Sequence, residues 1–170
     1  MHIVLMQPEI PQNTGNIART CAATGAKLHL IKPLGFELSD RYLKRAGLDY
    51  WHMMDFCVYE SWDEFIAKNP GARLHYATTK APRDYCRVEY RPDDFLVFGR
   101  ETKGLPEDLL AVHYEQCIRI PMRPDARSLN LSNSVAIVLY EALRQQNFAG
   151  LLEHGALHST QTAGDWQDYL

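Results

Sequence analysis

Residues 1–31 read MHIVLMQPEIPQNTGNIARTCAATGAKLHLI, and this stretch predicts a strand, a helix and a second strand. Two short apolar runs, His2–Met6 and Lys27–Ile31, have the length and the flanking turn residues of buried strands. Between them, Thr14–Thr24 carries apolar residues at helical spacing and is followed by Gly25, a residue that often ends helices. This unit is typical of sheets whose strands run parallel.

The same alternation continues along the chain. Further strands are expected at Arg73–Ala77, Phe95–Phe98 and Gln116–Ile120. Further helices are expected at Ser39–Ala46, from a capping box at Ser61 to about Lys68, and from Ser132 or Asn133 to Gln146. The pattern favours an α/β fold, a largely parallel sheet with helices on both faces, in which ligands bind beyond the carboxyl ends of the strands.

Composition indicates an ordinary folded domain. The chain has 170 residues, 46% of them hydrophobic and 23% charged, which excludes disorder as a description of the whole chain. We expect one domain over residues 1–150 and a polar, mobile tail over residues 151–170. No apolar run approaches the ~20 residues that span a bilayer, and no basic region precedes the first apolar run, so a cytoplasmic protein without membrane attachment is expected.

The spacing of the cysteines argues against a metal site, and the net charge argues against a basic surface over the whole chain. The four cysteines stand about thirty residues apart without a C-x-x-C pair or a nearby histidine at metal spacing, so buried thiols are expected, and no metal site. The net charge of −3 gives no overall basic footprint for nucleic acid. No lysine or arginine follows Arg144, so the basic residues are confined to the body of the chain.

The first candidate segment, Asn13–Cys21, follows the opening strand. Asn13 or Thr14 is expected to cap the helix, and Asn16 and Arg19 then project from one face at a spacing of three. An arginine near a helix start is well placed to bind a phosphate group. A capped surface helix with a solvated arginine is the alternative.

The second candidate segment, Phe98–Pro106, follows an apolar strand. Gly99 and Gly104 enclose four residues, but Leu105 comes where a phosphate loop requires lysine, and no G-x-G-x-x-G turn is present in the chain. Two glycines around a charged tetrapeptide indicate a backbone that approaches a ligand closely. A plain turn is the alternative.

The third candidate segment, Ile118–Val135, combines two prolines with three arginines at four-residue intervals. Serine and asparagine occupy positions 128, 130, 132, 133 and 134, more than one helix cap requires. Such side chains bond to the backbone and hold an irregular loop rigidly, while its remaining amides and carbonyls face a ligand. A long capped loop is the alternative.

Together these segments resemble the motifs of the SPOUT class of RNA methyltransferases, and most closely the small tRNA ribose 2'-O-methyltransferases of the TrmL (YibK) type. The resemblance covers residues 1–150, and several motifs occur in the family's order. It rests on Pro8–Arg19, the turn Leu34-Gly35-Phe36, Ala46–Tyr50, Thr78-Thr79-Lys80, Gly99–Pro106 and Arg127–Glu141.

The resemblance implies a C-terminal deep trefoil knot, which general rules of chain connection would not predict. It also implies a homodimer whose active site uses both subunits, and S-adenosylmethionine as the methyl donor, with S-adenosylhomocysteine as the product. By position, its cofactor contacts would be Ala77, Thr78, Gly99, Glu101, Gly104, Ile120, Ser128 and Leu129.

The acceptor implied by the resemblance is the ribose 2'-hydroxyl of the wobble nucleotide, cytidine or uridine, of leucine tRNAs. A guanidinium stays protonated and is a poor base, so Arg19 is expected to bind a phosphate and to stabilise charge on the acceptor oxygen. Glu101 is the carboxylate expected to move a proton or anchor the cofactor. Asn13 and Asn16 would position Arg19, and Asn130 with Ser132 would shape the acceptor pocket. The expected catalytic residues are therefore Arg19, Asn13, Asn16, Glu101, Asn130 and Ser132.

RNA contact would require a clustered basic face, because acidic residues offset the basic ones in number. Arg100 stands where relatives often have proline or a small residue, and its role is left open. The expected RNA-binding residues are Arg19, Arg41, Lys44, Arg45, Arg100, Lys103, Arg119, Arg123 and Arg127. Two other functions stay open: methylation of another tRNA position or of ribosomal RNA, and a non-catalytic RNA-binding module on the same scaffold.

Overall fold

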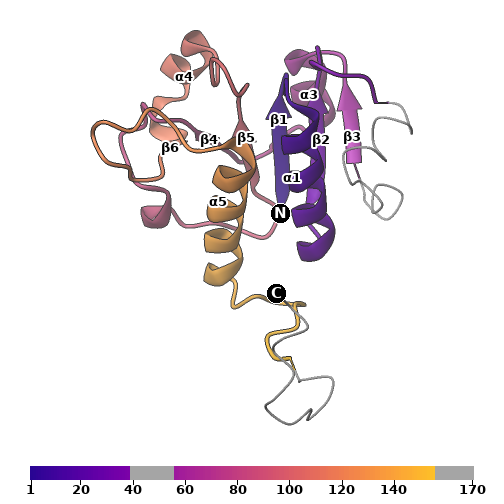
Figure 1. Ribbon diagram of the computed structural model, residues 1–170, viewed down its shortest axis with the longest axis vertical. Helices are drawn as coiled ribbons and strands as arrows, with labels where there is room; N and C mark the ends of the chain where they lie inside the picture. The colour runs from indigo at the N-terminus through magenta and orange to yellow at the C-terminus, as the bar shows by residue number, and fades with distance from the viewer. Residues whose placement is uncertain (39–55, 156–170) are drawn as a thin grey trace, which may run out of the picture.

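A sheet of six parallel strands forms the centre of the computed structural model, which describes residues 1–38 and 56–155 (Figure 1). The strands lie in the order β3-β2-β1-β5-β4-β6. Their bounds are β1 His2–Met6, β2 Lys27–Ile31, β3 Phe56–Tyr59, β4 Leu74–Ala77, β5 Phe95–Phe98 and β6 Cys117–Ile118. The predicted parallel α/β fold is confirmed. The trefoil knot stays a prediction.

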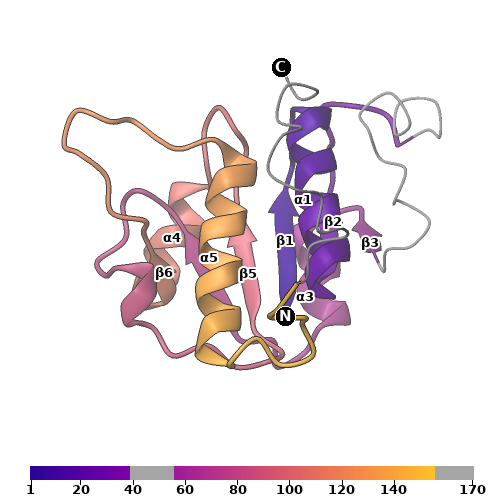
Figure 2. The same ribbon diagram turned by 60° about the horizontal axis from the view of Figure 1, so that its bottom comes forward.

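Helices cover both faces of this sheet. Figure 2 shows α1 (Pro11–Thr24) and α5 (Leu131–Gln145) side by side on one face, while α3 (Trp62–Lys68) and α4 (Glu107–Val112) cover the other. The alternation of side chains along β1 explains the two layers. Ile3 and Leu5 pack in the core under α1 and α5, whereas Val4 and Met6 pack with side chains of α3 and α4. None of the described helices is long and apolar enough to cross a bilayer.

Strand predictions are confirmed where apolar runs are continuous. β1, β2 and β5 have the predicted bounds, and β4 starts one residue later than expected. The predicted strand Gln116–Ile120 is too long, because the backbone of Arg119 bonds outside the sheet: its N–H donates to the Arg83 carbonyl (3.0 Å) and its carbonyl accepts from the Tyr85 N–H (2.9 Å). β3 and α4 were not predicted, and the expected helix Ser39–Ala46 lies outside the described residues.

Helix caps are only partly as expected. The Ser61 hydroxyl accepts from the Glu64 N–H (3.2 Å), which confirms the cap of α3. The prediction that Asn13 or Thr14 caps α1 is wrong: the helix starts at Pro11, after Ile10, and no side chain caps it. Proline is suited to the first helical position because its missing N–H would have no helical partner. Asn13 and Thr14 therefore lie inside the helix and are buried.

The order of the strands places a ligand site. The chain builds β1, β2 and β3 outward in one direction and places β5, β4 and β6 on the other side of β1. In open parallel sheets, ligands bind beyond the carboxyl ends of the strands where the order reverses. The loops that follow β1, β4, β5 and β6 are the segments that meet at this edge.

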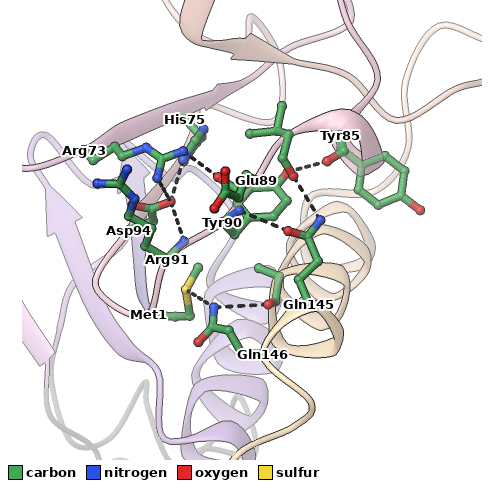
Figure 3. Close-up of polar contacts among 12 residues, drawn as sticks. Met1, Arg73, His75, Tyr85, Glu89, Tyr90, Arg91, Asp94, Gln145 and Gln146 are labelled. Atoms are coloured by element: carbon green, nitrogen blue, oxygen red, sulfur yellow. Dashed lines mark hydrogen bonds and ion pairs between the residues drawn. The ribbon is translucent and has the colours of Figure 1, made fainter.

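The opposite edge of the sheet is held by a buried carboxylate (Figure 3). Asp94 precedes β5 and is 1% exposed. Its Oδ2 atom accepts from the Arg91 N–H (2.9 Å) and lies 2.8 Å from His75 Nε2 and 3.6 Å from an Arg73 nitrogen. Because a buried carboxylate is costly without partners, this cluster fixes the start of β5 against β4.

This cluster predicts a loss of stability in mild acid. Burial lowers the pKa of His75, although Asp94 opposes the shift. Below the ordinary histidine pKa of about 6.5, the unfolded chain therefore binds a proton before the folded protein does, and the free energy of unfolding falls as pH falls. Between pH 7.5 and 5.5, we expect the melting temperature of His75→Gln to fall less than that of the parent protein. The glutamine amide can still donate a hydrogen bond to Asp94. Parallel pH profiles of the two proteins would contradict this.

Candidate functional site

A cavity of about 560 Å³ lies at the carboxyl ends of β4, β5 and β6. The last residue of each strand, Ala77, Phe98 and Ile118, forms part of its wall, together with the loops that follow. The volume is within the range of sites that bind nucleosides and other small molecules. All three candidate segments contribute residues to it.

The structure places every expected cofactor residue on the wall of this cavity. They are Ala77, Thr78, Gly99, Glu101, Gly104, Ile120, Ser128 and Leu129. Apolar side chains such as Leu105 and Ile118 lie beside the polar Thr78 and Ser128, a mixture that suits a ligand with an apolar ring and a polar tail. That these eight residues bind a cofactor stays a prediction.

The β5–α4 loop turns sharply and needs both glycines. The Gly104 N–H donates to the Arg100 carbonyl (2.9 Å), and Gly104 has a φ of 69°, in the left-handed region that favours glycine. A Cβ added to Gly99 would lie 2.1 Å from the carbonyl carbon of Gly104. The close approach is between two backbone segments of the loop itself, and the predicted approach of this backbone to a ligand stays a prediction.

Glu101 fastens this loop to the start of α1. Its Oε2 atom accepts from the Glu9 N–H (2.8 Å), and its Oε1 atom accepts from the Ile10 N–H (3.2 Å) and from Nδ2 of Asn13 (3.0 Å). Both carboxylate oxygens are thus bonded to the β1–α1 segment. The geometry supports a role in holding the site together.

Asn13 continues the connection to the third segment. Its Oδ1 atom accepts from Nδ2 of Asn130 (3.0 Å), whose own Oδ1 accepts from the N–H and the hydroxyl of Ser132 (2.9 and 2.7 Å). Because Asn13 is 5% exposed, its amide requires such partners. Asn130 also caps α5, so part of the serine- and asparagine-rich run is a helix start. One chain of hydrogen bonds, from Glu101 to Ser132, joins all three candidate segments.

The remaining expected catalytic residues lie outside this cavity wall. Asn16 and Arg19 are exposed on α1, and neither lines the cavity within the described part of the chain. Ser132 does not line the cavity, but its hydroxyl donates a hydrogen bond to Asn130, which does. A single chain therefore brings Asn13, Glu101 and Asn130 to the cavity, while Arg19 is exposed on α1 and is not part of the wall.

Four basic residues, Lys80, Arg100, Lys103 and Arg127, belong to the wall of the cavity. Of the expected RNA-binding residues, Arg119 and Arg123 are not part of this wall. The expected RNA-binding residues Arg41, Lys44 and Arg45 lie outside the described residues. Among residues 1–38 and 56–155, no group of three or more side chains could hold a metal ion.

Sequence reasoning missed Lys80 and Thr102 as residues of the wall. Lys80 donates to Glu107, and this bond lowers the pKa of that carboxyl. The signal for Lys80 was its position just after β4, in a motif already noted for its resemblance. Thr102 had a similar signal, because it lies between Gly99 and Gly104.

Comparison with known proteins agrees with this geometry. The family model described as "SpoU rRNA Methylase family" matches residues 1–140. The tRNA (cytidine(34)-2'-O)-methyltransferase of Methylovorus glucosotrophus is 52% identical over 149 residues, which cover 87% of this chain and 97% of that protein.

Two solved structures are similar in fold and in sequence. One, described as "Structural insights into the 2-OH methylation of C/U34 on tRNA", has a TM-score of 0.81 at 48% identity and covers 86% of this chain and 95% of its own. The other is an AdoMet-bound rRNA methyltransferase from Sinorhizobium meliloti, with a TM-score of 0.73 at 27% identity, covering 84% of this chain and 55% of that one. The resemblance noted from the motifs is confirmed, and the chain belongs to the SpoU methylase family of RNA methyltransferases.

Proposed function

We propose that the protein transfers a methyl group from S-adenosylmethionine to the ribose 2'-hydroxyl of the anticodon wobble nucleotide, position 34 of tRNA, in the cytoplasm. The observation that carries this proposal is the cavity whose wall contains all eight expected cofactor residues. Relatives named or described for methylation at position 34 support the choice of acceptor, at 52% and 48% identity. The cofactor of the Sinorhizobium meliloti relative supports the choice of donor.

The cavity suits S-adenosylmethionine in size and in chemistry. When bound, this molecule supplies a sulfonium methyl group that is open to attack by an oxygen nucleophile. Leu105, Ile118 and Ile120 provide apolar surface for a purine ring, and Thr78 and Ser128 provide hydroxyl groups. Gly104 has no side chain, and a Cβ added there would meet no atom within 4 Å, so a ligand can contact the backbone of the loop at this residue.

A second subunit completes the site in this proposal. Arg19 is exposed and lies away from the cavity of its own chain, yet developing charge on the acceptor oxygen requires a cation close by. We therefore propose a homodimer in which Arg19 of one subunit reaches the cavity of the other, with Asn16 beside it. There Arg19 would bind a phosphate of the RNA and stabilise the negative charge that develops on the acceptor oxygen, whose proton passes to solvent water.

Attachment of the RNA would depend on the basic residues of the cavity wall. Arg100, Lys103 and Arg127 carry positive charge at the wall, where they would bind the phosphates on either side of the reacting ribose. Arg119 and Arg123 lie between β6 and α5, in the same segment as Arg127, and would add further phosphate contacts. A dimer presents two such faces, which offsets the weak attraction expected from a chain of net charge −3. The proposed substrates are leucine tRNAs with cytidine or uridine at position 34.

Methyl transfer to defined tRNAs tests this proposal. Purified protein and S-adenosylmethionine are incubated with unmodified leucine tRNA transcripts, and nucleosides are identified by mass spectrometry. We expect a 2'-O-methylated nucleoside at position 34, and none when deoxyribose replaces ribose there. Methylation only elsewhere in tRNA or in ribosomal RNA would overturn the choice of acceptor. RNA binding without transfer to any RNA would identify a non-catalytic module.

A further inference from the structure

We propose that Glu9 is a positioning residue for the cofactor. It acts through Thr102, and Gly35 packs against the backbone of Glu9 and holds it in place. The inference rests on the proposed function, since it concerns the affinity of the same cavity for S-adenosylmethionine. Glu9 and Gly35 do not line the cavity, and Thr102 does. Their contribution would therefore be to fix the shape of the loop that forms the wall.

Two carboxylates join the β1–α1 segment to the β5–α4 loop, and each accepts hydrogen bonds from the segment to which the other belongs. The Glu9 carboxylate accepts from the Thr102 hydroxyl (2.7 Å) and from the Thr102 N–H (3.2 Å). In return, the Glu101 carboxylate accepts from the backbone N–H of Glu9 (2.8 Å). Hydrogen bonds to ionised groups are stronger than neutral ones, so these reciprocal bonds restrict how far the two segments can move apart.

Gly35 fixes the backbone that carries Glu9. Its N–H donates to the Pro8 carbonyl (2.9 Å), and a Cβ at this position would lie 2.6 Å from both the Cα and the carbonyl oxygen of Glu9. Only glycine allows this contact without a shift of the backbone. The turn Leu34-Gly35-Phe36, which belongs to the family resemblance but lines no part of the cavity, thereby gains a function as the support of Glu9.

The consequence for the ligand follows from the position of the loop. Every residue from Gly99 to Leu105 lines the cavity, so a loop that adopts several conformations offers a complete binding site for only part of the time. Apparent affinity falls by the fraction of molecules in the competent state. Glu9 itself contributes no atom to the cavity wall. Loss of the Glu9–Thr102 hydrogen bonds would therefore weaken cofactor binding only by making the loop more mobile.

The test measures S-adenosylmethionine binding by calorimetry without RNA, together with the melting temperature. We expect Glu9→Ala and Thr102→Val each to raise the Kd about fivefold, and Thr102→Ser, which keeps the hydroxyl, to stay within about twofold of the parent. The double variant should bind about as weakly as either single one, because both substitutions remove the same interaction. In methyl-transfer assays, KM for the cofactor should rise while kcat at saturation stays within about twofold.

Glu60→Gln is the matched control, since it alters a carboxylate that pairs with Lys32 on the surface away from the cavity. It should change neither the Kd nor the KM. Weaker binding by Thr102→Val but not by Glu9→Ala would overturn the inference and indicate direct contact of Thr102 with the ligand. Equal Kd values for all variants would also overturn it and leave the proposed function intact. Failure of the parent protein to bind S-adenosylmethionine would instead overturn the proposed function.

Discussion

Replacing Arg19 by alanine is expected to lower the rate of methyl transfer to tRNA by about 100- to 1,000-fold, the usual effect of removing one group that stabilises an oxyanion. Cofactor affinity should change by less than about threefold, because Arg19 is not part of the wall of its own cavity and, in the proposed dimer, acts on the RNA rather than on the cofactor. Single-turnover transfer assays and calorimetry measure the two quantities separately. An equal loss of both would contradict the assigned role.

Arg19→Lys separates charge from geometry. Lysine keeps the positive charge but cannot bind a phosphate through two parallel N–H groups, so we expect partial activity, between those of the parent and of Arg19→Ala. An activity as high as that of the parent would indicate that charge alone suffices.

A mixing experiment tests whether Arg19 acts in the neighbouring subunit. Thr78→Trp places a bulky side chain on the cavity wall and should block cofactor binding, while its Arg19 stays intact. When subunits of this variant and of Arg19→Ala exchange, one site of each mixed dimer combines an open cavity with an intact Arg19. Activity should then rise from near zero to about a quarter of the parent value, as random pairing in a twofold dimer predicts. No rise on mixing would place Arg19 in its own subunit's reaction.

The sequence predicts most of the sheet because its central strands are continuous apolar runs. β1, β2 and β5 are buried on both faces, and apart from His2, Lys27 and His29 all their residues are apolar, so their limits are plain. β3 (Phe56–Tyr59) is also an apolar run of four residues, but it lies at the edge of the sheet, is only partly buried and was missed. α4 has six residues with two acidic ones in its first turn. Periodicity cannot be recognised over elements this short.

The site was predictable as a set of segments, but its internal connections were not. Asn13 stands where a helix cap is usual, and its residue type fits a cap as well as it fits a buried link. What decides between them is the presence of Glu101 and Asn130 on either side of its amide, residues that lie far away in the sequence. Glu9 and Thr102 are likewise joined across the fold. Spacing along the chain carries no information on such pairs.

The largest effect on cofactor binding is expected from Gly99→Ala. The added Cβ would lie 2.1 Å from the carbonyl carbon of Gly104 and 2.2 Å from the nitrogen of Leu105, and both are backbone atoms that no rotamer change can move aside. The loop between them must therefore open, and it forms one wall of the cavity. We expect S-adenosylmethionine affinity to fall by about 100-fold and the melting temperature by about 5 °C, both measured on the purified protein.

Two other glycines separate this steric effect from the loss of glycine itself. Gly104→Ala meets no atom within 4 Å but must keep a φ of 69°, so it should cost about 1 kcal/mol of stability and weaken binding moderately. Gly155→Ala meets no atom within 4 Å, and neither affinity nor melting temperature should change. The expected order of effects is therefore Gly99, then Gly104, then Gly155. Cofactor binding by Gly99→Ala equal to that of the parent would contradict this argument. It would mean that the loop can open at Gly99 without losing the binding site, so that the close contact of Gly99 with Gly104 does not determine the shape of the cavity.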